Sequence, residues 1–274
     1  MTGLRIAHLS DIHFGDENVE AVAAAAAQLR ADPPDLTIIS GDLTRFAEKD
    51  EFVAAAAWLE SLPDPLLVTP GNHDAPYIAW AERIFRPFAR YQRAIGPVWR
   101  QSHRAEGLAV EGVNTARGAQ WRLNWSKGAI RAAQAQDACA RLRQAEGLKV
   151  LVCHHPLIEL PHGPMTGRVR GGRAAAQAFA EAGVDLVLTG HLHAPFALAY
   201  PFADGRTYAV GAGTLSVRER GVPAGFNMLN VERAAIEIAA LAWNGSSFDP
   251  WRTWSLDRRR PRPRSDAAIA ANGP

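Results

Sequence analysis

The sequence predicts an α/β fold in which two packed β-sheets carry helices on their outer faces. Three observations support this prediction. Short apolar runs alternate with helical segments over roughly the first two thirds of the chain, only strand-like segments follow, and no repeat or linker divides the sequence. Strand–helix alternation followed by a run of strands is typical of sheets that pack together under helices. We therefore expect one domain over residues 1–256, followed by a tail over residues 257–274.

The expected elements follow in order from apolar periodicity and from helix-breaking residues. The first strand, residues 4–9, leads into an alanine-rich helix over 17–30 that Asp32-Pro33-Pro34 ends. A helical segment over 75–93 contains Pro87, which should interrupt it. The other expected strands are 36–39, 66–68, 98–103, 108–113, 150–152, 186–188, 196–200, 207–210, 226–231 and 235–243, and the other expected helices are 48–59, 127–146 and 171–182.

Charge and hydropathy exclude several classes of function. The formal net charge is only +2, which argues against a stable nucleic-acid partner, and no apolar run approaches the ~20 residues of a membrane span. The sequence opens directly in a predicted strand, without a basic and apolar leader, so we expect a cytoplasmic protein. The basic segment 258–264 cannot bury enough apolar surface to fold alone, and we expect a disordered tail that allows at most weak peripheral contact with a membrane.

Seven side chains that can bind a metal follow the predicted strands. Ligands bind outside the carboxyl ends of strands in open α/β sheets, so residues far apart in sequence can meet there. Imidazole combined with Asp or Asn oxygen suits Mn, Fe, Zn, Ni or Co better than Ca or Mg, and the absence of cysteine from the set argues against a structural thiolate zinc site. The seven residues are Asp11, His13, Asp42, Asn72, His154, His191 and His193.

The order of the motifs around these residues resembles that of the calcineurin-like metallophosphoesterase superfamily. The resemblance covers roughly the first 215 residues, and five motifs in the right order are far more specific than any one alone. It is closest to the branch that contains class III cyclic-nucleotide phosphodiesterases and glycerophosphodiesterases, with bacterial UDP-diacylglucosamine pyrophosphohydrolases as more distant relatives. It implies a four-layer α/β/β/α sandwich of two mixed sheets flanked by helices. The motifs are Asp11-x-His13, Gly41-Asp42, Gly71-Asn72-His73-Asp74, His154 and Gly190-His191-x-His193.

The resemblance also implies a binuclear metal centre with a metal-bridging hydroxide as the nucleophile at phosphorus. Asp42 would bridge the two ions, since a carboxylate has two oxygens to share. His73 would contact the phosphate and assist the leaving oxygen, and Asp74 would orient His73. The other ligands would be Asp11, His13 and His193 for one ion, and Asn72, His154 and His191 for the other.

For several further side chains, the sequence allows either a structural or a functional role. Strand alternation sends the adjacent His154 and His155 to opposite sides, and the family motif places the ligand two residues before the proline, so His155 should line the entrance or be exposed. His8 should be a core or supporting histidine. The remaining candidates for substrate contact are His162, Trp121 and Trp125.

These features favour a phosphodiesterase acting on a small soluble phosphodiester, either a cyclic nucleotide or a glycerophosphodiester. The basic tail and the tryptophans motivate an alternative, a lipid-linked pyrophosphate hydrolase of the UDP-diacylglucosamine type at the membrane surface. A DNA nuclease is disfavoured by the near-neutral charge. A metal-free scaffold with the same fold is disfavoured because no ligand position is missing.

Overall fold

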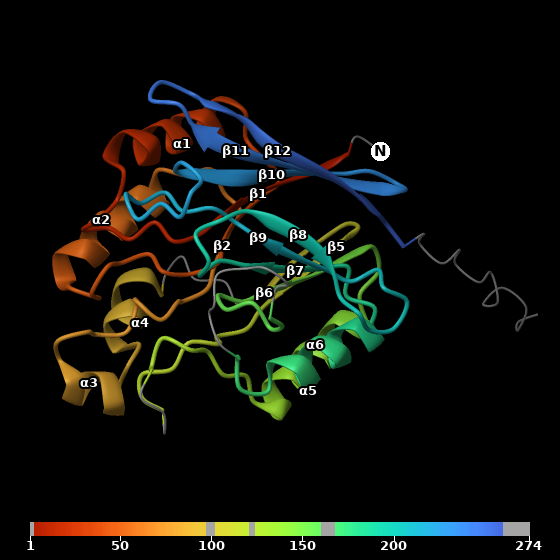
Figure 1. Cartoon of the computed structure of the whole chain (residues 1–274), viewed down its shortest axis with the longest axis horizontal. Coiled ribbons are helices and arrows are strands. Elements are labelled where there is room, and N and C mark those ends of the chain that lie inside the picture. The colour runs from red at the N-terminus through yellow and green to blue at the C-terminus, as the bar shows by residue number, and fades with distance from the viewer. Residues whose placement is uncertain (1–2, 97–101, 121–123, 160–167, 260–274) are drawn as a thin grey trace, which may run out of the picture.

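The computed structural model describes residues 3–96, 102–120, 124–159 and 168–259, which form two stacked six-stranded sheets (Figure 1). In the first sheet, the three N-terminal strands are parallel to each other and the three C-terminal strands join antiparallel, so the sheet is mixed, as predicted. Its strands are, in spatial order, β12 (Phe248–Asp257), β11 (Ala235–Trp243), β10 (Gly225–Val231), β1 (Leu4–Leu9), β2 (Leu36–Ile39) and β3 (Leu66–Val68).

The second sheet is also mixed, with a parallel centre and one antiparallel strand at each edge. Parallel strands need a crossover connection, and helices supply it on the outer face of each sheet. Most of the strand expected over 98–103 lies outside the described residues. The strands in spatial order are β4 (Ser102–Ala105), β5 (Leu108–Gly112), β6 (Leu148–Val152), β7 (Leu186–Thr189), β9 (Tyr208–Gly211) and β8 (Phe196–Ala199).

Helices cover both outer faces, which completes the four predicted layers (Figure 1). Two long helices pack on each sheet. Two short helices lie on either side of Pro87, as predicted, and the second of them packs into the same core as the helices of the first sheet. No helix in the described residues is long and apolar enough to cross a membrane. The helices are α1 (Val19–Ala31), α2 (Lys49–Glu60), α3 (Trp80–Phe85), α4 (Ala89–Ile95), α5 (Ala132–Arg143) and α6 (Gly172–Glu181).

Three apolar cores separate the layers. Successive residues of a strand face opposite sides of its sheet. In β1, Ile6 therefore packs between the two sheets with Val150 of β6, whereas Ala7 packs in the core under α1 and α2. On the outer face of the second sheet, Leu151 packs with Phe179 of α6. Because both faces of each central strand are buried, the strands read as continuous apolar runs rather than as alternating ones.

The C-terminal part of the fold differs from the prediction. The strand β12 was not expected, because Pro250 interrupts its segment and most of its side chains are exposed at a sheet edge. This strand ends at Asp257, next to the expected boundary at 256. Arg259 then forms ion pairs with Asp185 and Asp204, at 3.2 and 2.6 Å. Residues 257–259 thus contact the folded domain, and the remainder of the predicted tail lies outside the described residues.

Candidate metal centre

The carboxyl ends of strands from both sheets converge on one cluster of imidazole, carboxylate and amide groups. Asp11 and His13 follow β1, Asp42 follows β2, and Asn72 follows β3, all from the first sheet. The second sheet supplies His154 after β6 and both His191 and His193 after β7. All seven are buried except His191, which is half-buried. Four overlapping sets of potential ligand atoms lie within 4.8 Å of one another, namely Asp11–His13–His193, His13–Asp42–His73, Asp11–Asp42–His154 and His154–His155–His191.

Asp42 occupies the middle of this cluster. Its Oδ2 atom lies 3.1 Å from Nε2 of His154 and 3.9 Å from Nε2 of His13, while its Oδ1 atom accepts the backbone N–H of His73 at 2.8 Å. Burial opposes ionisation of this carboxyl, but the surrounding imidazoles, His154 foremost, lower the pKa of Asp42 below its usual range. Asp42 is therefore a buried carboxylate that faces histidines from both sheets.

Backbone carbonyls fix the orientation of three histidine rings. Nδ1 of His154 donates to the carbonyl of Ser40 at 2.8 Å, and Nδ1 of His193 donates to that of Arg218 at 2.8 Å. Nδ1 of His13 makes the same kind of bond to Thr44 at 3.3 Å. A carbonyl can only accept, so the ring proton is on Nδ1 and the lone pair of the neutral ring is on Nε2, which faces the cluster. This is the arrangement that a metal-binding histidine requires.

The electrostatics of the cluster favour a positive charge at its centre. Nε2 of His13 and Nε2 of His193 lie 3.2 Å apart, and two lone pairs at that distance repel unless a cation or proton lies between them. Burial should lower the pKa of His154, yet the charge of Asp42 raises it to about 9. Burial, together with the charge of His154, lowers the pKa of His191 to about 3, which keeps that ring neutral.

Unpaired buried atoms provide an independent test of whether metals fit here. Oδ1 of Asn72, Oδ1 of Asp11 and Nε2 of His154 are buried and make no hydrogen bond within the described residues. Buried polar atoms are normally paired, and those left over need an explanation. All three belong to the predicted ligand set, and all three offer a lone pair when the His154 ring is neutral, so the residues fit a bound cation in place of the proton.

The backbone is strained where these side chains are presented. Five of the seven non-glycine residues with positive φ in the described chain belong to this cluster. Such left-handed conformations cost energy for residues with a side chain and are concentrated at functional sites. The tight reversal after each strand turns the side chains back over the strand ends. The five are Asp11 (φ 55°), His13 (53°), Asp42 (52°), His191 (69°) and His193 (57°).

The three motif glycines are required for two different reasons. Gly41 has φ 102°, and a Cβ there would lie 2.7 Å from Nδ1 of His154. Gly71 and Gly190 do not have positive φ, so their backbone conformation does not require glycine. A Cβ at Gly71 would instead overlap Oδ1 of Asp42, and one at Gly190 would overlap Ser10. Close packing against the cluster excludes any side chain at these positions.

His73 lies at the cluster as expected, but its orienting partner differs from the prediction. Nδ1 of His73 bonds to the backbone carbonyl of Arg45 at 2.7 Å, not to Asp74. Asp74 instead accepts the backbone N–H groups of Thr44 and Gly71 through its two oxygens, at 3.0 and 2.8 Å. It therefore joins the loop after β2 to the loop after β3, and it supports the cluster through the backbone.

His155 is buried and is not among the residues that line the cavity, so the expectation that it lines the entrance or is exposed is wrong. Its ring lies 4.6 Å from that of His191, measured between centroids. One ring nitrogen bonds to the hydroxyl of Thr115 at 2.9 Å, and the other bonds to the carbonyl of Ser126 at 2.8 Å. His155 thus connects the loop 124–126 to the metal centre. His8 is a buried core histidine bonded to Ser40, as expected.

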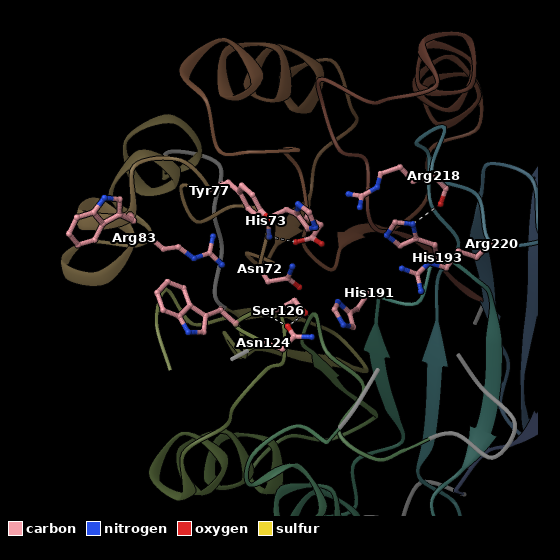
Figure 2. A pocket seen from close by; sticks show the side chains of 13 residues that line it. Asn72, His73, Tyr77, Arg83, Asn124, Ser126, His191, His193, Arg218 and Arg220 are labelled. Atoms are coloured by element: carbon pink, nitrogen blue, oxygen red, sulfur yellow. Dashed lines mark hydrogen bonds between the residues drawn. The ribbon is translucent and has the colours of Figure 1, made fainter. Parts of the chain in front are cut away.

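A cavity of about 610 Å³ opens over the cluster, within the usual range for small-molecule sites (Figure 2). Its floor includes Asp42, Asn72, His73, His191 and His193. Of the wall residues, the sequence predicts only Trp125, because the others belong to helix α3 and to loops that carry no motif. Trp121 and His162, the other two candidates for substrate contact, lie outside the described residues. The wall residues are Tyr77, Trp80, Arg83, Asn124, Trp125, Ser126, Arg218 and Arg220.

Comparison with known proteins gives a consistent result. A family model described as calcineurin-like phosphoesterase matches residues 4–195. A probable cyclic nucleotide phosphodiesterase from Synechococcus sp. is 25% identical over 242 residues, which cover 84% of this chain and 88% of that protein. The glycerophosphodiester phosphodiesterase GpdQ of Enterobacter lignolyticus is 34% identical over 80 residues, which cover 25% of this chain and 29% of that protein.

Among solved structures, a dimetal phosphatase from Danio rerio has a similar fold, with a TM-score of 0.66 and 11% identity over 93% of this chain and 98% of that chain. The two-sheet architecture, the cluster at the strand ends and the family match over most of the chain agree with one another. The chain therefore belongs to the calcineurin-like phosphoesterase family and is a metal-dependent phosphoric ester hydrolase.

Proposed function

We propose that this protein is a phosphodiesterase that uses two transition-metal ions to hydrolyse a small phosphodiester. The observation that carries the proposal is the position of Asp42, whose Oδ2 atom lies between His13 of one predicted ligand set and His154 of the other. A carboxylate in that position can bridge two ions. The names of the two curated relatives support a phosphodiester rather than a phosphomonoester, and a cyclic nucleotide or a glycerophosphodiester is the proposed substrate class.

In this proposal each ion takes ligands from both sheets. When bound, the pair of ions would polarise the phosphoryl oxygens and activate water for attack on phosphorus. The choice among Mn, Fe, Zn, Ni and Co follows supply in the cell as well as ligand type. One ion would be held by Asp11, His13, Asp42 and His193, and the other by Asp42, Asn72, His154 and His191.

The residues around the ions would position the substrate. Because Nδ1 of His73 donates to the carbonyl of Arg45, its Nε2 atom is left to face the substrate phosphate or the leaving oxygen. The network from Thr115 through His155 to Ser126 holds the wall of the cavity against the metal centre. These contacts fix the reacting groups before the substrate arrives, which lowers the entropic cost of the reaction.

Removal and restoration of metals tests the proposal directly. Protein stripped with a chelator is expected to lose hydrolysis of bis(p-nitrophenyl) phosphate, and addition of Mn²⁺, Zn²⁺, Co²⁺ or Ni²⁺ in excess over two ions per chain should restore it. Metal content is measured in parallel by mass spectrometry. A panel of cyclic AMP, glycerophosphodiesters, single-stranded DNA and a phosphomonoester then separates the substrate classes. A reconstituted protein that binds two ions per chain and hydrolyses none of these would contradict the proposal.

One observation favours a second candidate, a lipid-linked pyrophosphate hydrolase at the membrane surface. Five large apolar side chains, each 40 to 81% exposed, lie within residues 77–85, and two of them, Tyr77 and Trp80, line the cavity. Exposed apolar patches of this kind mark sites of contact with proteins, ligands or membranes, and aromatic rings suit the membrane interface. The rim patch consists of Tyr77, Ile78, Trp80, Ile84 and Phe85.

Vesicle flotation distinguishes this candidate. If the rim patch contacts a membrane, the protein should float with phospholipid vesicles, and Ile78→Ser combined with Phe85→Ser should abolish flotation, because both side chains are more than 70% exposed. Val53→Ser is the matched control, since Val53 is 69% exposed on α2 outside the patch. A protein that stays with the soluble fraction at every lipid composition would exclude action at a membrane surface.

A further inference from the structure

The wall of the cavity contains a buried arginine that pairs with no carboxylate of the described residues. Arg83 on α3 is only 6% exposed. Its guanidinium donates to three backbone carbonyls, from Nε to Gly118 at 2.8 Å and from Nη1 to Ala75 and Pro76 at 2.9 and 3.1 Å. Carbonyl dipoles orient the guanidinium but do not neutralise its charge, and a buried unpaired charge is costly.

One nitrogen of this guanidinium remains available on a residue that lines the cavity. Nη2 of Arg83 has no acceptor in the described part of the chain, whereas Nε and Nη1 are both engaged. Figure 2 shows the guanidinium extending from α3 toward Asn72, over the hollow. The centroid of the Trp125 ring lies 5.9 Å from the guanidinium carbon. Burial lowers the pKa of Arg83, yet an arginine remains charged at neutral pH.

The rest of the cavity wall has the same sign of charge. Among the described residues that line it, Asp42 is the one carboxylate, and Asp42 belongs to the metal cluster. Arg218 and Arg220 lie on the side of the cavity opposite Arg83, with their side chains pointing inward (Figure 2). They are exposed, so they are screened by water and contribute less to selectivity than a buried guanidinium. The described wall contains no anionic group that would pair with a cationic substrate arm.

We propose that Arg83 forms a subsite for a second anion on the substrate, separate from the phosphorus that reacts at the metal centre. This inference rests on the proposed phosphodiesterase function and names the substrate class: phosphodiesters in which one arm carries a phosphate or carboxylate. Arg83 takes part in no bond making or breaking. It binds the arm through a charge-assisted hydrogen bond from Nη2, and the same positive wall disfavours arms that end in a quaternary or primary ammonium.

A charge series on one skeleton tests the subsite. The substrates are p-nitrophenyl alkyl phosphodiesters whose alkyl arm, three to six carbons long, ends in a carboxylate, a phosphate, a carboxamide or a trimethylammonium group. The leaving group is the same in all of them, so differences in kcat/KM report binding of the arm. We expect the best anionic arm to exceed the carboxamide arm by roughly 10- to 100-fold, the range for hydrogen bonds to charged groups. Comparison of the carboxylate arm with the phosphate arm shows which of these two anions the subsite prefers.

The variant Arg83→Gln should remove this preference, bringing the ratio of anionic to carboxamide kcat/KM close to one. The ratio is the diagnostic quantity because Arg83 also holds Gly118, and any misfolded fraction lowers both rates equally. Arg83→Lys should keep part of the preference, since it retains the charge without the planar fork. Arg86→Gln is the matched control, because Arg86 is exposed one residue beyond α3 and does not line the cavity.

Three results would overturn the subsite. The first is a wild-type enzyme that shows no preference for an anionic arm at any length. The second is a preference that Arg83→Gln leaves intact. The third is a preference that disappears in Arg218→Gln or Arg220→Gln instead. An enzyme that hydrolyses no member of the series rejects the proposed phosphodiesterase function, whereas equal hydrolysis of all members rejects only the subsite.

Discussion

Replacement of Asp42 by asparagine is expected to lower kcat/KM on bis(p-nitrophenyl) phosphate by on the order of 10³-fold, together with a loss of bound metal. Metal ions contribute several kcal/mol to the transition state, and about 1.4 kcal/mol corresponds to tenfold in rate. Asparagine preserves the shape of Asp42 and an oxygen that can accept the N–H of His73, but it replaces the oxygen proposed to bridge the ions with a donor that cannot bind a cation.

Metal content and thermal unfolding of the Asp42→Asn protein should be measured beside its activity. The matched control is Asp50→Asn, which removes an exposed carboxylate on α2 and should change neither metal content nor rate. If Asp42→Asn retained two ions per chain and more than a tenth of the activity, Asp42 could not be the bridge between them.

Gly41→Ala is expected to have the second largest effect, because two independent costs coincide. The φ value of 102° is unfavourable for alanine, and the new Cβ would lie 2.7 Å from Nδ1 of His154 and 2.8 Å from the backbone nitrogen of Gly71. Backbone strain of this kind costs about 1–3 kcal/mol, and relief of the overlap must displace His154 from the cluster. We therefore expect a lower unfolding temperature and a loss of activity together.

Gly245→Ala separates the two costs. Gly245 has almost the same φ, 99°, but a Cβ there would meet no atom within 4 Å. It should show the destabilisation that comes from backbone strain and keep full activity. The difference between the two variants measures how strongly the approach of Gly41 to His154 constrains the metal centre. Equal stability and activity in both variants would show that the contact with His154 tolerates a side chain.

Much of the fold and the centre of the site could be predicted from the sequence because each depends on local patterns. The buried strands are continuous apolar runs, such as residues 36–39, and the predicted metal ligands come shortly after these runs. The early start predicted for α5 was wrong, since residues 127–131 instead pair with the segment before α6 through Ala129 and Arg170. That pairing depends on a tertiary contact, which the helix propensities of residues 127–131 do not reveal.

The walls of the cavity could not be predicted for the same physical reason. Arg83 lies in an amphipathic stretch where an arginine is ordinarily exposed, and only the fold shows that three carbonyls surround it. His155 was expected to line the entrance or to be exposed, because strand alternation places it opposite His154. The chain leaves the strand before this residue, so alternation no longer applies, and Thr115 and Ser126 close over the ring.

The cluster draws its side chains from two sheets that, in the described residues, share no hydrogen-bonded edge. Asp11 and Asp42 belong to the first sheet, and His154 and His193 belong to the second, so ions held among them would cross-link the sandwich at its seam. Binding to the native state alone stabilises it by mass action. Apolar side chains between the sheets, such as Ile38 and Leu188, therefore set the distance between the two halves of the metal centre. A substitution in this core should change the free energy of unfolding and the metal affinity together.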